Sequence, residues 1–161
     1  MKIKVGFGYD VHQLKSGEKL ILGGVDVPST KGTVGHSDAD VLIHAICDAL
    51  LGAANLGDIG QHFPDNDPQY FHINSSILLK EVVQLLKQNK FEIGNIDSTI
   101  CLQKPKITSF IPKMKARLSV VLGIPETEIS IKATTTEKLG FVGEGKGVSA
   151  YAVVLIEKIS L

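Results

Sequence analysis

The chain has 161 residues, which suits one domain with a substantial hydrophobic core, and we expect a single domain over residues 1–161. Seventeen basic and seventeen acidic residues cancel to a formal net charge of 0, so the composition gives no support to a role on nucleic acid or at a membrane surface. The apolar runs are too short to span a bilayer, and the N-terminus enters a strand pattern without a signal segment, which favours a cytoplasmic protein. The two cysteines, Cys47 and Cys101, lack C-x-x-C spacing and are interpreted as packing residues.

The first dozen residues alternate between large apolar side chains and smaller or polar ones, which predicts a strand to about Val11. Its period of two places Asp10 and His12 on one face at the end of the strand. A hairpin is expected around Gly23-Gly24, where apolar triplets flank the turn.

A helix is predicted over residues 39–54, with Ser37 as its N-cap and Asp40 in the position of a capping-box acid. Asp40, His44 and Asp48 are spaced four residues apart, so they share one face of this helix. Residues 63–68 are rich in proline and aspartate and are interpreted as a surface loop. The remaining predicted elements are helices over 76–89 and 109–122 and strands over 96–102, 129–133 and 148–159.

This order of elements predicts an α+β fold: a mixed β-sheet with helices packed on one face, a variant of the ferredoxin-like arrangement. Too few helices are available to cover the other face of the sheet. We therefore expect an oligomer that buries the other face.

Asp10, His12 and His44 are the candidate metal ligands. Two imidazoles and a carboxylate fill three positions of a tetrahedral zinc site and leave the fourth open, as in catalytic zinc sites. A single histidine on a helix is more often a packing or surface residue than a ligand. The three together favour a metal site, because acidic and imidazole groups beside an apolar helix are costly to bury unless something pairs with them.

Two further polar segments are candidates for binding phosphate. Residues 133–138 place hydroxyls, an acid and a lysine at the end of a strand, where they suit phosphate oxygens and a hard cation, although a solvated polar turn is an equal alternative. His36 and Ser37 are expected at a helix N-terminus, where free N–H groups attract anions. Residues 140–146 match G-x-x-x-x-G-K, but Gly147 replaces the hydroxyl of a P-loop and a strand follows, so a turn is favoured.

Six blocks of sequence occur together in a fixed order. They are G-Y-D-V-H (8–12), G-H-S-D-A-D (35–40) with His44 after it, D-A-L-L-G-A-A (48–54), G-D-I-G (57–60), F-P-D-N-D-P (63–68) and K-A-T-T-T-E-K-L-G-F (132–141). In this order, over essentially the whole chain, they resemble the 2-C-methyl-D-erythritol 2,4-cyclodiphosphate synthase family.

The resemblance implies a homotrimer with active sites between neighbouring subunits. It implies Zn²⁺ at Asp10, His12 and His44, and Mg²⁺ or Mn²⁺ at Glu137. It also implies that His36 and Thr135 are catalytic, by stabilising the transition state.

The same resemblance implies the substrate contacts. Those to the phosphates and the methylerythritol phosphate portion are Asp10, His12, His36, Ser37, Asp58, Ile59, Gly60, Phe63, Pro64, Asp65, Asn66 and Asp67. Those to the cytidine and its neighbourhood are Leu102, Gln103, Lys104, Pro105, Lys106, Ile107, Thr108, Ala133, Thr134, Thr135, Thr136, Glu137 and Phe141.

The implied reaction belongs to non-mevalonate isoprenoid biosynthesis and makes the enzyme a phosphorus–oxygen lyase. The 2-phosphate of 4-diphosphocytidyl-2-C-methyl-D-erythritol 2-phosphate attacks the β-phosphorus, which closes the cyclic diphosphate and releases CMP. Two alternatives stay open: a zinc phosphohydrolase that uses the same triad to activate water, and a non-catalytic module that binds cytidine nucleotides.

The resemblance fails at one loop. Many members of the family have the pattern G-R-G-E-G, whereas this chain has Glu144 and Lys146 within Gly143–Gly147, so the order of the charges is reversed. We expect Glu144 and Lys146 of neighbouring subunits to pair, because their i, i+2 spacing puts them on one side of an extended segment.

Overall fold

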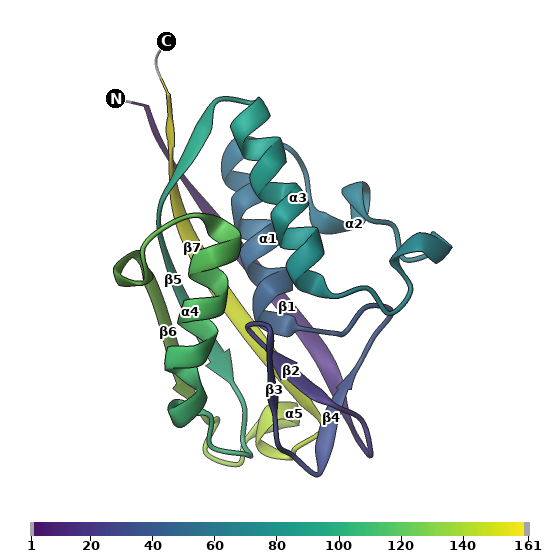
Figure 1. Cartoon of the computed structure of the whole chain (residues 1–161). Coiled ribbons are helices and arrows are strands. Elements are labelled where there is room, and N and C mark those ends of the chain that lie inside the picture. The colour runs from purple at the N-terminus through teal and green to yellow at the C-terminus, as the bar shows by residue number, and fades with distance from the viewer. Residues whose placement is uncertain (1, 160–161) are drawn as a thin grey trace.

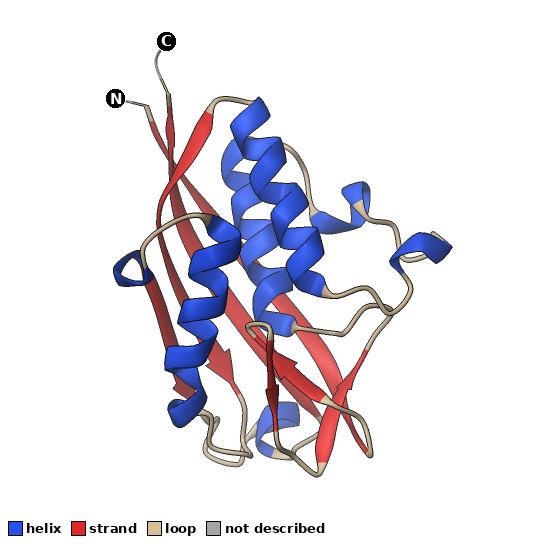
Figure 2. Ribbon diagram, in the orientation of Figure 1, coloured by secondary structure: helices blue, strands red, loops and turns tan. Residues whose placement is uncertain are grey.

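The computed structural model describes residues 2–159, and the predicted domain of 1–161 includes residues 1, 160 and 161, which lie outside this range. The main sheet has the strand order β4-β1-β7-β5-β6 (Figures 1 and 2). In chain order its strands are β1 (Ile3–Ser16), β4 (Lys31–Val34), β5 (Phe91–Cys101), β6 (Ile129–Thr134) and β7 (Gly147–Lys158). Only β5 and β6 pair in parallel among these described strands, and β2 (Leu20–Leu22) and β3 (Val25–Val27) form a separate hairpin.

Three long helices cover one face of this sheet, as Figure 2 shows: α1 (Val41–Ala54), α3 (Ser75–Gln88) and α4 (Ile111–Leu122). Helix α1 lies between β1 and α3, and for this reason almost every one of its side chains is buried. Helix α4 connects the parallel strands β5 and β6, and α2 (Ile59–His62) and α5 (Gly140–Gly143) are single turns in loops. None of the helices described here has the length and apolar character needed to cross a membrane.

Two glycines of β1 allow α1 to approach the sheet closely. A Cβ atom on Gly6 would overlap the carbonyl oxygen of Ala49, and one on Gly8 would overlap that of Ala45. Both positions face the helix, as do Asp10 and His12 further along the same strand, because alternate residues share a face. The close approach therefore brings the helix down onto the part of β1 that carries the predicted ligands.

The mixed α+β fold with helices on one face is confirmed. The principal elements run β-α-α-β-α-β-β, however, whereas the ferredoxin-like arrangement runs β-α-β-β-α-β, so the likeness to that fold is limited to its layers. The three long helices begin and end within two residues of their predicted bounds. Strand β1 continues to Ser16, beyond the predicted end, because its last four residues pair with β4, which the sequence pattern did not reveal.

The predicted cap of the first long helix is wrong. Ala39 adopts a positive φ of 54°, which breaks the chain away from helical geometry, and the helix begins at Val41. Asp40 is the N-cap: its carboxylate accepts from the backbone N–H of Ile43 and also from those of Gly23 and Gly24 in the β2–β3 turn. Ser37 lies in the preceding loop.

The second face of the sheet is uncovered and apolar. We call it the open face and define it by large side chains of β1 and β7, of which Val5 is 65% and Phe7 63% exposed. Its members are Ile3, Val5, Phe7, Tyr9, Val11, Tyr151 and Val153. Phe7 and Tyr9 both pack against the ring of Tyr151. A continuous apolar surface of this kind marks a site of association.

Candidate functional site

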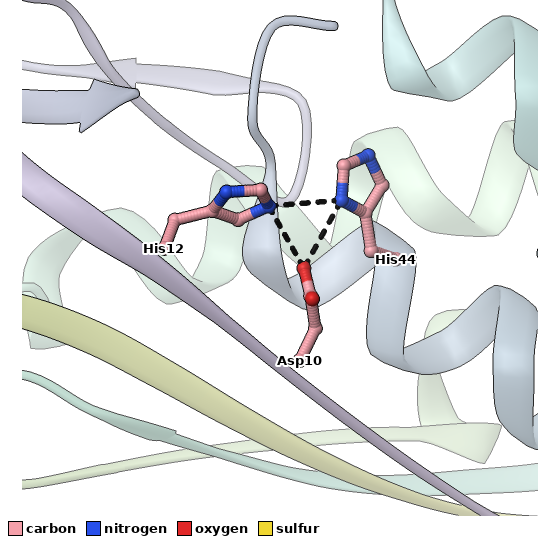
Figure 3. A group of neighbouring side chains, drawn as sticks. All are labelled: Asp10, His12 and His44. Atoms are coloured by element: carbon pink, nitrogen blue, oxygen red, sulfur yellow. Dashed lines mark hydrogen bonds and ion pairs between the residues drawn. The ribbon is translucent and has the colours of Figure 1, made fainter. Parts of the chain in front are cut away.

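Asp10, His12 and His44 converge in the structure, as Figure 3 shows. Asp10 Oδ2 lies 2.9 Å from His12 Nε2 and 3.0 Å from His44 Nδ1, and the two imidazole nitrogens lie 3.1 Å apart. Ligand atoms about 2.0–2.1 Å from a tetrahedral zinc are roughly 3.3 Å apart, so this triangle needs to widen only slightly to hold the ion. The donor set and its geometry thus fit a zinc ion with one coordination position left open.

The second ring nitrogen of His12, Nδ1, has a hydrogen-bond partner of its own. His12 Nδ1 donates to the carbonyl oxygen of Val34 at 3.1 Å. This bond leaves Nε2 without a proton in the neutral ring, and directs its lone pair at Asp10 and His44. Strand β4 therefore contributes to the site through its backbone.

In the metal-free protein, Asp10 and His12 each favour the charged form of the other and so shift each other's pKa. Burial by itself raises the pKa of Asp10, but hydrogen bonds from His12 and His44 outweigh it and lower this pKa to about 2. Burial lowers the pKa of His12, but the hydrogen bond and charge of Asp10 outweigh that effect and raise it above 6.5. Asp10 is therefore held as a carboxylate, the form that ligates a cation.

A cleft of about 350 Å³ opens above the triad. Its walls come from β1, the loop before α1, the start of α1, the segment between α1 and α3, and the start of α3. The lining residues are Asp10, His12, Gly35, His36, Ser37, His44, Ile59, Gly60, Phe63, Asp65, Tyr70, Ile73 and Leu78. A polar floor beneath partly apolar walls suits a small ligand with anionic groups.

The N-terminus of α1, where we expected an anion to bind, is already capped by a carboxylate. The Asp40 carboxylate occupies the first turn of the helix, and a carboxylate there repels a second anion. His36 and Ser37 still line the cleft, from the loop. Asp58 and Asp67 flank the cleft and cap the short helical turns that follow them.

The other predicted contacts gather at a second location. Leu102 N donates to Thr134 O at 2.9 Å, and Lys138 N donates to Gln103 Oε1 at 3.3 Å, so residues 102–108 and 133–138 adjoin each other. Asp10, Ala150, Ile100 and Ala133 lie in register on β1, β7, β5 and β6. Three strand spacings of about 4.8 Å put roughly 14 Å between the triad and this second location. None of its residues lines the cleft.

Within the second location, Thr135 and Glu137 are exposed. Glu137 has a positive φ of 55°, and its N–H donates to Thr135 Oγ1 at 3.3 Å. The two side chains thus belong to one tight turn after β6. Phe141 packs near Gly147 at the start of β7, also outside the cleft.

Several residues in the cleft or directly behind it were not predicted as site residues: Asp38, Tyr70, Ile73, Ser75 and Leu78. Three of them, Tyr70, Ile73 and Leu78, line the cleft, and Ser75 and Asp38 bond to the groups behind it. Asp38 lies within the block G-H-S-D-A-D, so the resemblance to the family could have indicated it as a site residue. Ser75 had no such signal, because its role depends on where α3 begins relative to α1.

The charged pair at Glu144 and Lys146 forms within one chain. Lys146 Nζ lies 2.6 Å from Glu144 Oε2, and this partner raises the pKa of Lys146. The segment is a turn with Gly145 at a positive φ of 71°, and not the extended segment we expected. Lys31 Nζ donates to Gly145 O at 3.0 Å and ties the turn to β4.

The fold and the cleft together define an α+β protein with a candidate metal centre of one carboxylate and two imidazoles. Residues 3–157 match the YgbB family, and the chain belongs to this family.

Several relatives of the chain have the same name. The chain is 60% identical to 2-C-methyl-D-erythritol 2,4-cyclodiphosphate synthase of Bacteroides fragilis over 159 residues, which is 99% of this chain and 100% of the relative. It is 56% identical to the synthase of Syntrophomonas wolfei over 97% of this chain and 99% of the relative.

Two solved structures share the fold. The bifunctional IspDF of Campylobacter jejuni matches with a TM-score of 0.95 and 40% identity, over 99% of this chain and 43% of that one. The IspF–CDP complex of Plasmodium falciparum matches with a TM-score of 0.86 and 36% identity, over 98% of this chain and 97% of that one.

Proposed function

We propose that this protein is a 2-C-methyl-D-erythritol 2,4-cyclodiphosphate synthase in non-mevalonate isoprenoid biosynthesis, acting through one domain over the whole chain. The observation that carries the proposal is the convergence of Asp10, His12 and His44 at the floor of the cleft, in a chain 60% identical to a synthase of this name. The substrate is 4-diphosphocytidyl-2-C-methyl-D-erythritol 2-phosphate, and the products are the cyclic diphosphate and CMP.

The chemistry requires alignment and charge neutralisation more than proton transfer. The nucleophile is a phosphate oxygen that is already anionic, so no side-chain base is needed to generate it. Zinc held by Asp10, His12 and His44 would supply positive charge, with its open position for a phosphoryl oxygen. His36 and Ser37 line the cleft and would orient the phosphates by donating hydrogen bonds. A 2-phosphate oxygen forms a bond to the β-phosphorus while the bond between that phosphorus and the CMP oxygen breaks. No water is consumed, and on this ground we class the enzyme as a phosphorus–oxygen lyase.

Residues 102–108 and 133–136 form the proposed cytidine pocket, and Glu137 the proposed contact to Mg²⁺ or Mn²⁺. An exposed carboxylate in a turn rich in hydroxyls and carbonyl oxygens suits a hard divalent ion that retains water ligands. Thr135 is proposed to stabilise the transition state from the same turn. The loop 58–67 covers the methylerythritol phosphate portion.

A homotrimer reconciles this pocket with the triad. The two locations lie roughly 14 Å apart across the sheet of one chain, so the ion at the triad and the ion at Glu137 can both bind one diphosphate only if the second location comes from a neighbouring copy. The open face supplies the apolar surface that such a neighbour requires. The substrate and products are small and soluble, and we propose the cytoplasm as the place of action.

Turnover of the diphosphocytidyl substrate tests the proposal. Purified protein with Zn²⁺ and Mg²⁺ is expected to yield CMP and the cyclic diphosphate in equal amounts, followed by mass spectrometry. Release of inorganic phosphate would identify a phosphohydrolase instead. Stabilisation by CDP with no turnover would identify a binding module.

The metal assignment has its own test. Asp10→Asn and His44→Ala are expected to lose bound zinc and nearly all turnover, because each removes one of three protein ligands. Metal analysis of the purified variants measures the loss, and full zinc occupancy in both would contradict the assignment.

A further inference from the structure

The two ring nitrogens of His44 have different surroundings. Nδ1 faces Asp10 and His12, and Nε2 points away from them, as Figure 3 shows. Nε2 lies 2.9 Å from Ser75 Oγ and 3.1 Å from Ser37 Oγ. A serine hydroxyl from the start of α3 and one from the loop before α1 therefore both reach the back of this ligand.

A cation on Nδ1 imposes a requirement on Nε2. The coordinating nitrogen carries no proton, so in the neutral ring the proton resides on Nε2 and needs an acceptor. A ring without that acceptor rotates more freely, and the ligand is held less firmly. The identity of the acceptor behind His44 thus affects how well the triad holds its ion.

Ser75 is the better acceptor of the two hydroxyls. It is fully buried, and its Oγ donates its only proton to the Asp38 carboxylate, which leaves the oxygen lone pairs free to face His44. Ser75 N also donates to Asp38 Oδ2 at 3.1 Å, so the same carboxylate fixes both the backbone and the side chain. Ser37 Oγ makes no bond to a carboxylate among the described residues, and it already accepts from Ala39 N at 3.1 Å.

The backbone strengthens this arrangement. Asp38 N donates to Ile73 O at 3.0 Å, and His72 N donates to His36 O. Residues 36–38 and 72–75 are therefore joined by backbone bonds as well as by the Asp38 carboxylate. The loop before α1, which forms one wall of the cleft, is therefore fixed at Asp38, the residue whose carboxylate holds the Ser75 hydroxyl against His44.

We propose that Ser75 and Asp38 are positioning residues of the metal centre: Ser75 accepts the Nε2 proton of His44, and Asp38 orients the Ser75 hydroxyl. This inference rests on the proposed zinc site, and it assigns to the N-terminus of α3 a role in metal affinity. Neither residue belongs to the triad or lines the cleft.

Zinc affinity by competition with a chromophoric chelator tests the proposal. Ser75→Ala is expected to weaken zinc binding by about 10- to 100-fold, the range for the loss of a hydrogen-bond partner behind a ligand. Asp38→Asn is expected to weaken it less, because the amide oxygen still accepts. The double variant is expected to match Ser75→Ala alone, since Asp38 acts on His44 only through Ser75.

Ser76→Ala is the matched control, because it removes the same hydroxyl one residue further along α3, from a side chain whose oxygen makes no bond to His44. It is expected to leave zinc affinity unchanged. Cobalt(II) in place of zinc gives a second readout: its visible absorption should shift in Ser75→Ala and not in Ser76→Ala. Thermal unfolding of the metal-free variants reports folding separately, and Asp38→Asn keeps the side-chain shape if Ser75→Ala does not fold.

The outcomes separate the two proposals. Wild-type protein that binds no zinc would overturn the metal centre itself. Wild-type protein that binds zinc, with Ser75→Ala binding it equally well and with an unshifted cobalt spectrum, would overturn only the positioning role. A loss in Ser37→Ala without one in Ser75→Ala would transfer the role to Ser37. Losses that multiply in the double variant would show that Asp38 acts independently.

Discussion

At the scale of single residues, Asp10 supplies the negative charge of the triad. It is the carboxylate toward which both histidines point. Burial raises its pKa, but the hydrogen bonds from His12 and His44 outweigh burial and lower it; Asp10 in turn outweighs the effect of burial on His12 and raises the pKa of that ring. These shifts belong to the metal-free protein, where the Asp10–His12 pair contributes to the stability of the fold without help from an ion. They therefore predict how stability depends on pH when the metal has been removed.

The Asp10 contribution is present above pH 3.8, its ordinary value, and is lost as the pH falls through about 2. The His12 contribution is fully present below pH 6.5 and is lost as the pH rises through its raised pKa. Chemical denaturation of the protein in EDTA should show the pair's greatest contribution between these values, near pH 4–6.5, amounting to about 2 kcal/mol from Asp10. Asp10→Asn should remove this maximum; a pH profile identical to that of the wild type would contradict the pairing.

Glu137 gives a second prediction at this scale. Glu137→Gln is expected to keep full zinc occupancy, because the residue lies outside the triad, and to lose most of the activation by Mg²⁺ or Mn²⁺, because a neutral amide is a weak partner for a hard cation. Activity titrations with each ion measure the change, and Glu126→Gln on the surface serves as control. An unchanged response in Glu137→Gln would place the second ion elsewhere.

At the scale of elements, the contact of β1 with α1 determines where His44 lies. Gly8→Ala would force a methyl group against the carbonyl of Ala45, one residue from His44. We expect a loss of about 1–3 kcal/mol in unfolding free energy and weaker zinc binding, since the helix must move away from the strand.

Gly52→Ala is the control for this substitution. Gly52 lies in α1, the helix against which Gly8 packs, and nothing lies within 4 Å of the position of its added Cβ. It should therefore stabilise the protein by up to about 1 kcal/mol through helix propensity. Denaturation curves and chelator competition on both variants provide the comparison, and equal behaviour of the two would show that the close approach has no consequence.

The predictability of these elements followed their regularity. Helices α3 and α4 have one apolar stripe each, and their bounds were predicted closely from it. Strand β5 begins at Phe91, five residues before its predicted start, because a bulge between Ile93 and Asn95 interrupts its alternation. Strand β4 is only four residues long and has no alternation of its own.

The site was predictable to the extent that chemistry is local in sequence. Asp10 and His12 share one strand, and the ligand types alone suggested His44 as their partner. Asp40 is the helix cap because Ala39 has a positive φ and the helix starts after it. The sequence did not predict this, since nothing in the alanine side chain favours such a conformation. Ser75 comes to His44 only through the packing of α3 on α1, which a pattern along the chain does not describe.

At the scale of the whole molecule, the open face predicts association. Phe7→Glu places a charge in the middle of this apolar surface and is expected to convert the proposed trimer to monomers, because an unpaired charge is costly to bury. Val120→Glu on α4 is the control, since that side chain is 84% exposed on the helix-covered side. Sedimentation at matched concentrations measures the result, and an intact trimer in Phe7→Glu would exclude the open face as the interface.

The roughly 14 Å between the triad and the turn that carries Thr135 has a consequence for mixtures of damaged chains. Asp10→Asn would damage the metal half of the proposed site, and Thr135→Ala would damage its proposed pocket half. If neighbouring copies contribute one half each, equal co-expression of the two inactive variants makes about a quarter of all sites intact, because each half is undamaged in half of the chains. Two inactive proteins would thus complement each other and recover about a quarter of wild-type turnover, whereas sites built within single chains would recover none.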